Sequence, residues 1–217
     1  MHIYEGVLTG TVAGQGVLVA GAALTAVGTA IGLYKMDYER IPRVAVLSAA
    51  FFVVSAIHLP LGPTSEHLLL AGLMGLVLGW AAFPAVLIAL LLQAVFFSFG
   101  GLTTLGINTT IMALPAVACY HLFHRTVRNG GEKTAFAVGF LTGAAAIILG
   151  ALLNAGSLWI TGPEFRIIGA VVATMHLPLA VVEGLVTGSV VLLLRKVRPE
   201  LFGASPLTCS PHEASYG

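Results

Sequence analysis

The sequence contains little charge and very little cysteine. Of its 217 residues, 9% are charged and 58% are hydrophobic, and the mean hydropathy is +0.98. Soluble domains carry about a quarter charged residues, and disordered chains are poor in apolar residues, so the composition excludes both classes. The two cysteines, Cys119 and Cys209, form no CxxC motif, which excludes a disulfide framework and a thiolate metal site. The composition therefore indicates a polytopic membrane protein.

Motifs of several enzyme classes are also absent from the sequence. There is no GxxxxGKS or GxxxxGKT motif, so the chain has no ATP-binding loop of this type. Neither HExxH nor GxSxG occurs, which argues against an intramembrane metalloprotease or a serine hydrolase. Ten basic and nine acidic residues almost cancel, so no nucleic-acid partner is expected. We therefore expect neither enzymatic activity nor a bound cofactor in this chain.

Apolar stretches separated by polar or Gly/Pro-rich segments predict an all-α bundle of about seven transmembrane helices. We expect a single transmembrane domain over residues 1–198, followed by a flexible cytoplasmic tail over residues 199–217. Such a chain would be a multi-pass protein of the prokaryotic cell membrane. The predicted spans are Val7–Leu33, Val44–Leu59, His67–Ala82, Phe83–Phe99, Ile107–His124, Thr134–Ile160 and Ile167–Leu194.

The basic residues predict how the bundle is oriented, because Lys and Arg in short loops stay on the cytoplasmic side. With seven crossings, nine of the ten basic residues fall on one side and only Arg166 falls on the other. We therefore expect the N-terminus outside and the C-terminus inside. The nine residues are Lys35, Arg40, Arg43, Arg125, Arg128, Lys133, Arg195, Lys196 and Arg198.

The N-terminus offers a chelating group for a transition metal. It lacks the features of a signal peptide, and a bulky residue at position 2 normally blocks removal of the initiator, so we expect Met1 to be retained. The Met1 amine, the His2 amide nitrogen and the His2 imidazole can then close two fused rings on one ion. Ni(II) and Cu(II) favour this planar, nitrogen-rich geometry. An imidazole from His67 or His58, both expected at the outer face, would complete the plane.

Other polar residues lie within or beside the apolar spans. Thr103 and Asn108 flank a Gly-rich outer loop, which could cover a small-ligand pocket and hydrogen-bond its ligating groups. His176 and Glu183 lie one heptad apart on one helix face, as either a structural polar pair or part of an ion path.

Small residues repeat at four-residue spacing in the first predicted span, at Ala22, Ala26 and Ala30. This pattern allows close approach of helix backbones in a bilayer. It fits packing within the bundle and docking of another membrane subunit equally well.

Three segments together resemble the CbiM/NikM family, the substrate-binding S components of energy-coupling-factor transporters for nickel or cobalt. The resemblance covers nearly the whole chain, to about Arg198. The segments are Met1-His2-Ile3-x-Glu5-Gly6, Gly62-Pro63-Thr64-Ser65-x-His67-Leu68-Leu69 and Gly100-Gly101-Leu102-Thr103-Thr104-Leu105-Gly106-x-Asn108-Thr109.

The resemblance implies a seven-helix S component whose N-terminal segment inserts into the bundle. It implies that the ion is held by the Met1 amine, the His2 amide and imidazole, and His67. Five further residues are expected to support these ligands or to gate access to them: Ser65, Thr103, Asn108, His58 and His176. A planar set of four nitrogens with a deprotonated amide favours Ni(II), with Co(II) the weaker expectation.

The resemblance also implies partner subunits. These are a transmembrane coupling protein and two ATP-binding-cassette ATPase subunits, and some members need a small accessory membrane subunit. Ala22, Ala26 and Ala30 are similar to the small-residue contact that the family uses with the coupling protein. The alternative expectation is a stand-alone secondary transporter of a cation or small solute that uses His176 and Glu183.

Overall fold

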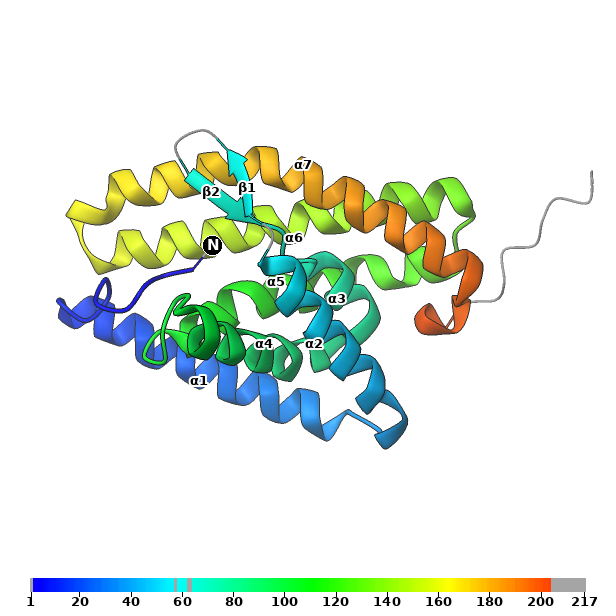
Figure 1. The fold of residues 1–217 in the computed structure, drawn as a ribbon, viewed down its shortest axis with the longest axis horizontal. Coiled ribbons are helices and arrows are strands. Elements are labelled where there is room, and N and C mark those ends of the chain that lie inside the picture. The colour runs from blue at the N-terminus through cyan, green and yellow to red at the C-terminus, as the bar shows by residue number, and fades with distance from the viewer. Residues whose placement is uncertain (1, 57, 62–63, 204–217) are drawn as a thin grey trace, which may run out of the picture.

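α-Helices make up most of the chain in the computed structural model, which describes residues 2–56, 58–61 and 64–203 (Figure 1). The helices are α1 (Val12–Tyr34), α2 (Ile41–Ser55), α3 (Ala71–Leu78), α4 (Ala82–Phe97), α5 (Leu105–Asn129), α6 (Glu132–Thr161) and α7 (Arg166–Val197). Short 3-10 helices lie between or after them: η1 (Tyr38–Arg40), η2 (Gly79–Ala81), η3 (Pro163–Phe165) and η4 (Pro199–Phe202). The predicted all-α membrane bundle is confirmed.

Five segments of the described chain are long and apolar enough to cross a membrane, which makes this a multi-pass membrane protein. One of them combines α3, η2 and α4, from Ala71 to Phe97. Helix α3 alone has 8 residues. It is therefore about 12 Å long, against a hydrocarbon core of about 30 Å. Seven separate crossings and their orientation stay predictions.

A short β-hairpin precedes α3, which the sequence analysis did not foresee. Strand β1 (His58–Leu61) pairs antiparallel with β2 (Thr64–His67), and His58 lies opposite His67. The predicted span His67–Ala82 therefore begins too early, because the backbone of residues 64–67 is extended and the helix begins at Ala71. The side chains of residues 57–66, including His58 and Ser65, lie outside the described part of the structure.

Helix α3 lies within the bundle, and its first six residues are buried. Gly75 allows its close approach to α5, because a Cβ atom at this position would collide with the backbone oxygen of Ala116. Short elements can be buried in a membrane protein only where the surrounding protein satisfies their backbone groups.

At the start of α3, Glu183 of α7 accepts hydrogen bonds from these backbone groups. Its Oε2 accepts a hydrogen bond from the Leu69 amide at 3.1 Å, and its carboxylate also faces the amides of Leu70 and Ala71. Leu70, the N-cap residue, makes no side-chain capping hydrogen bond. A carboxylate at a helix N-terminus pairs the N–H groups that lack helical partners and opposes the helix dipole. Glu183 thus has a structural contact with the start of α3, and its pairing with His176 and its place on an ion path both stay predictions.

Helix α1 buries one face and exposes another. Ala22, Ala26 and Ala30 are exposed. Most of the packing of α1 within the bundle uses a different face from the alanine stripe, but Ala22 borders α5, because a Cβ atom at Gly106 would lie 2.6 Å from the Ala22 Cα. The buried residues of α1 are Gly14, Gly21, Thr25, Gly28 and Gly32.

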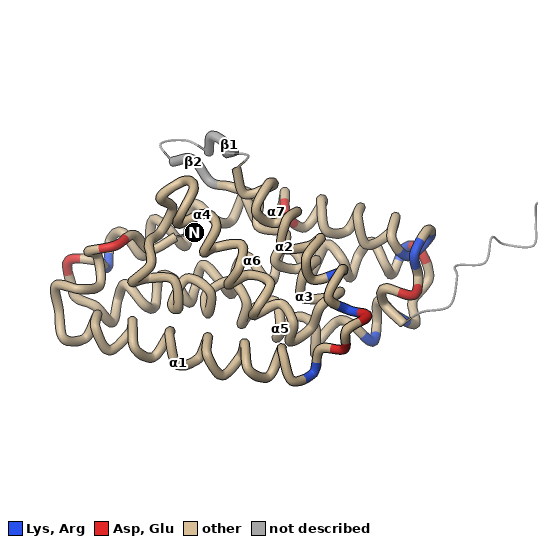
Figure 2. The backbone as a smooth tube through the Cα atoms, turned by 60° about the horizontal axis from the view of Figure 1, so that its bottom comes forward, with Lys and Arg blue, Asp and Glu red and all other residues tan. Residues whose placement is uncertain are grey.

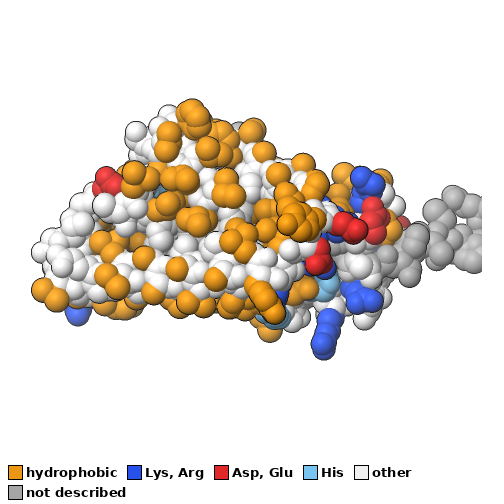
Figure 3. Space-filling model, turned by 90° about the horizontal axis from the view of Figure 1, so that it is seen from below, with side chains coloured by type: hydrophobic (Ala, Val, Ile, Leu, Met, Phe, Trp, Pro, Cys, Tyr) orange, Lys and Arg blue, Asp and Glu red, His pale blue; other side chains and the backbone are white. Residues whose placement is uncertain are grey.

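Charged residues lie mainly at the ends of the bundle, whereas Glu183 is buried within α7. Figure 2 shows most Lys and Arg residues gathered at the end where α1, α5 and α7 finish. Arg166 is the first residue of α7 and so lies at the opposite end of that helix. Hydrophobic side chains are spread over the side of the bundle that Figure 3 shows, as expected for a surface in contact with lipid tails.

The predicted tail from Pro199 begins with η4, whose Phe202 is fully buried among apolar side chains of the bundle. Residues 204–217 of that tail lie outside the described residues.

Candidate metal centre

The N-terminal segment runs back into the bundle before α1 begins (Figure 1). Ile3 and Leu8 are buried in the main apolar core, and His2 is partly buried. Burial of these two apolar side chains contributes the driving force that draws the segment inward. The insertion thus places His2 inside the bundle. Met1 lies outside the described residues.

Asn108 holds the backbone of this segment. Its Oδ1 accepts a hydrogen bond from the Ile3 amide at 2.9 Å, and its Nδ2 donates to the Ile3 carbonyl at 3.0 Å. The Asn108 side chain is buried and lies in the first turn of α5. It therefore pairs with Ile3 much as a neighbouring β-strand would, which fixes the backbone immediately after His2.

The Gly-rich loop before α5 forms a second attachment. The Glu5 amide donates to the Gly100 carbonyl at 3.2 Å, and Glu5 Oε1 accepts from the amide and hydroxyl of Thr103 at 3.0 and 3.2 Å. The Thr103 amide is the main reason why the pKa of Glu5 is lowered. Gly101 has φ +142°, and a Cβ atom there would collide with the Glu5 side chain. Thr103 thus contacts Glu5 and is linked to His2 through the N-terminal segment that carries both residues.

A chain of hydrogen bonds orients the His2 ring. Ser55 Oγ donates to the Phe52 carbonyl at 2.7 Å, so it accepts from Gln93 Nε2 at 2.6 Å. The Gln93 amide oxygen is therefore the atom that faces His2 Nε2, at 3.0 Å. This oxygen can only accept, so His2 carries its proton on Nε2 and has a lone pair on Nδ1.

His67 faces that lone pair. Its Nε2 lies 3.1 Å from His2 Nδ1, and the two ring centroids are 4.9 Å apart. Phe99 borders the pair on one side, with its ring centroid 6.1 Å from that of His2. Two nitrogens that occupy adjacent corners of a square-planar site lie about 3 Å apart, because metal–nitrogen bonds are about 2 Å long. His67 Nε2 donates its proton to this lone pair, and once that proton is released the two nitrogens can bind one ion.

The atom that faces His67 is also the correct one for the predicted chelate. Only Nδ1 of His2 can close a six-membered ring with the His2 amide nitrogen, because Nε2 is one atom further from the backbone. In the described part of the chain, no cluster of three or more His, Cys, Asp or Glu side chains could hold a metal. Further nitrogen donors at this place would therefore be the His2 amide and the Met1 amine.

Of the residues proposed from the sequence, the structure brings His2 and His67 together and attaches Asn108 and Thr103 to the same segment. His176 is buried on α7, where its Nδ1 lies 2.7 Å from the Val172 carbonyl of its own helix. A role for His176 at the ion stays a prediction.

Gln93 was not among the residues proposed from the sequence. This residue is fully buried and, as the contacts above indicate, determines the proton position of His2. The available signal was an amide inside the apolar run of the fourth predicted span, since polar side chains within a membrane usually face the bundle interior.

Asn108→Ala should loosen the N-terminal segment. Loss of two buried hydrogen bonds, each contributing about 1 kcal/mol, should speed amide exchange of residues 2–8 roughly tenfold or more. Hydrogen–deuterium exchange of the purified protein measures this. Thr109→Ala is the matched control, because its hydroxyl donates to Leu105 within its own helix. Equal exchange in Asn108→Ala and wild type would contradict the proposed attachment.

Comparison with known proteins places this geometry in context. Residues 2–201 match the family model described as "Cobalt uptake substrate-specific transmembrane region". A relative in Haemophilus influenzae whose name assigns it to metal transport is 40% identical over 203 residues, covering 93% of this chain and 96% of that protein. The cobalt transport protein CbiM of Sorangium cellulosum is 32% identical, covering 93% and 94% of the two chains. A solved structure of a transition metal transporter is 26% identical, with a TM-score of 0.69 over 91% of this chain and 93% of that one.

Proposed function

Since the chain belongs to the CbiM family of substrate-specific transmembrane proteins for cobalt uptake, we propose that it is the ion-capturing subunit of an ATP-driven importer. It binds Ni(II), and Co(II) less readily, at the outer face of a prokaryotic cell membrane. The observation that supports this proposal most directly is the distance of 3.1 Å between His2 Nδ1 and His67 Nε2. The substrate ion would bind both nitrogens at about 2 Å from each, to the side of the line that joins them.

The proposed ligands are the Met1 amine, the deprotonated His2 amide, His2 Nδ1 and His67 Nε2. In this chelate the Met1 amine and His2 Nδ1 occupy opposite corners of the square, with the His2 amide nitrogen between them. His67 Nε2 therefore occupies the remaining corner, which is next to Nδ1. The Gln93 oxygen keeps the proton on His2 Nε2, and the amide then has to lose its own proton. Late transition metals with a strong preference for nitrogen donors promote that loss, which favours Ni(II) over Co(II).

Elemental analysis and the visible absorption spectrum of the purified chain test the identity of the ion. A planar Ni(II) centre with four nitrogen donors gives a yellow, diamagnetic protein. Recovery of cobalt with the spectrum of a high-spin ion would overturn the nickel assignment while leaving the capture function in place.

Energy for transport has to come from other subunits, because the sequence contains no ATP-binding loop of the GxxxxGKS or GxxxxGKT type. We propose that a transmembrane coupling protein joins this chain to two ATPase subunits. The exposed alanine face of α1 supports this, because small residues allow a second helix to pack closely in a bilayer. A small accessory membrane subunit is a further candidate partner, given that a relative of 30% identity in Rhodobacter capsulatus is named as a fused nickel transport protein, NikMN.

Ala26→Leu should separate capture from transport. The larger side chain projects from the exposed face of α1, so the purified variant should still retain nickel. Uptake by cells that express the full set of subunits should fall at least tenfold, because the partner helix can no longer approach. Radioactive nickel uptake measures the loss.

Ala20→Leu is the matched control, since this residue is also exposed on α1 but about 120° around the helix from the alanine face. Equal uptake by both variants would contradict docking at Ala22, Ala26 and Ala30. Full uptake by cells expressing this chain alone would instead support a stand-alone transporter.

A further inference from the structure

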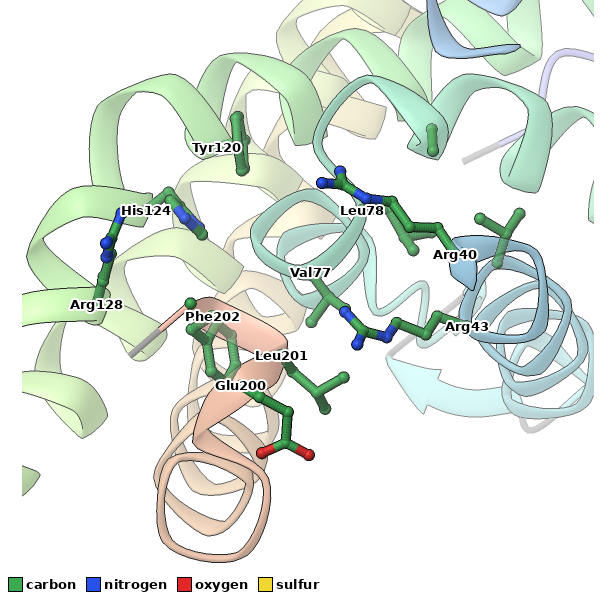
Figure 4. Close-up of a pocket in the computed structure, with 13 residues that line it drawn as sticks. Arg40, Arg43, Val77, Leu78, Tyr120, His124, Arg128, Glu200, Leu201 and Phe202 are labelled. Atoms are coloured by element: carbon green, nitrogen blue, oxygen red, sulfur yellow. The ribbon is translucent and has the colours of Figure 1, made fainter. Parts of the chain in front are cut away.

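A cavity of about 200 Å³ opens at the basic end of the bundle (Figure 4). It lies between the start of α2, the end of α3, the last turns of α5 and η4. Arg40 and Arg43 reach toward it from the α2 side, and His124 and Arg128 border it from α5. The described contacts of the metal centre involve none of these residues.

The charge around this cavity is strongly positive. Arg40 has an exposed ion pair with Asp37 at 3.5 Å, and the one acidic lining residue, Glu200, is already paired with Arg198 at 3.5 Å. Among the described residues, neither Arg43 nor Arg128 forms an ion pair. The cavity therefore has two guanidinium groups available for an anion.

The helix start and the uncharged side chains also border the cavity. Helix α2 begins there with no side-chain cap and no acidic residue in its own first turn, and Glu39 lies in the 3-10 turn directly before it. His124 Nδ1 lies 3.2 Å from the Leu76 carbonyl and donates to it. The Tyr120 side chain also borders the space and can donate a hydrogen bond. The Tyr120 hydroxyl can therefore contact a negatively charged ligand, whereas His124 Nδ1 is already paired with the Leu76 carbonyl.

The rest of the lining is apolar. Val44, Val77, Leu78, Leu201 and Phe202 form the floor and one wall, and Phe202 is itself fully buried. Arg40, at the end of η1, and Arg43, in the first turn of α2, lie where an apolar helix begins, which is where head groups and acyl chains of lipids meet. An amphiphilic anion therefore fits this cavity better than a small hydrophilic one.

We propose that this cavity binds the phosphate group of an anionic phospholipid, with Arg43 and Arg128 as the principal contacts. Guanidinium groups recognise phosphate oxygens through paired hydrogen bonds, and the apolar floor receives the glycerol and the first acyl carbons. Basic pockets between transmembrane helices recognise lipid head groups in this way. The site is independent of the proposed metal capture.

Native mass spectrometry of the purified full-length chain tests the proposal. The protein is titrated with phosphatidylglycerol or with phosphatidylcholine in the same detergent. Wild type should retain one phosphatidylglycerol in preference to phosphatidylcholine. Arg43→Ala/Arg128→Ala should weaken phosphatidylglycerol binding roughly 30-fold, because each basic residue near a charged membrane surface contributes about a factor of five.

Arg125→Ala/Lys133→Ala is the matched control, because it removes the same charge from the same end but neither residue lines the cavity. Circular dichroism shows whether each variant keeps its helical content. An equal loss of lipid in both double variants, or equal retention of the two lipids by wild type, would overturn the proposal. Displacement of phosphatidylglycerol by inorganic phosphate at matched ionic strength would assign the site to free phosphate and overturn the lipid as its ligand.

Discussion

A chain with an uncleaved N-terminal extension should purify without nickel. The extension, free of His and Cys, moves the terminal amine away from His2 and turns the Met1 nitrogen into a peptide amide. The chelate then loses its amine donor and the two fused rings that make deprotonation of the His2 amide favourable. Nickel measured by elemental analysis should fall from about one ion per chain to background.

Proteolytic removal of the same extension provides the internal control. A protease that cuts directly before Met1 regenerates the free amine without any change in the folded bundle, and nickel binding should return. One further variant, with a single alanine inserted between Thr9 and Gly10, lengthens an exposed turn beyond the ligands and should retain nickel. Stoichiometric nickel in the uncleaved fusion would refute the N-terminal chelate.

His67→Ala should weaken nickel binding more than loss of a supporting residue does, that is, by more than about 10–100-fold. The substitution removes the nitrogen that lies 3.1 Å from His2 Nδ1 and would complete the square around the ion. Isothermal titration of the purified variant, or competition with a chelator of known affinity, measures the change.

His58→Ala is the comparison for this experiment. The backbone of His58 lies directly opposite His67 in the hairpin, so both variants alter the same local element. We expect His58→Ala to bind nickel with nearly the affinity of wild type. The reverse order of the two effects would make His58 the fourth ligand.

Most of the architecture could be predicted from the sequence, because membrane insertion imposes strong local rules. A chain that is 58% hydrophobic with basic residues in three clusters allows few arrangements other than a helical bundle. The hairpin and the short helix α3 escaped prediction. Most of the hairpin lies between two predicted spans, where the sequence has no regular apolar pattern, and Glu183, the residue that caps α3, lies more than a hundred positions away.

The residues of the candidate site also differ in whether local sequence or a distant contact reveals them. His2 stands out in the sequence because a histidine next to a free amine has its own chelating chemistry. Gln93 does not, because its importance depends on a contact with a residue 91 positions earlier.

The sequence by itself determined that this protein spans a membrane many times, that its N-terminus offers nitrogen donors, and that basic residues gather in a few segments. These are properties of composition and of neighbours along the chain. The tertiary structure alone decided that His67 Nε2 meets His2 Nδ1, that Gln93 sets the proton on His2, and that arginines from α2 and α5 border one cavity. Such pairings depend on how segments distant in sequence pack, because side chains on two different helices can meet only where those helices lie against each other.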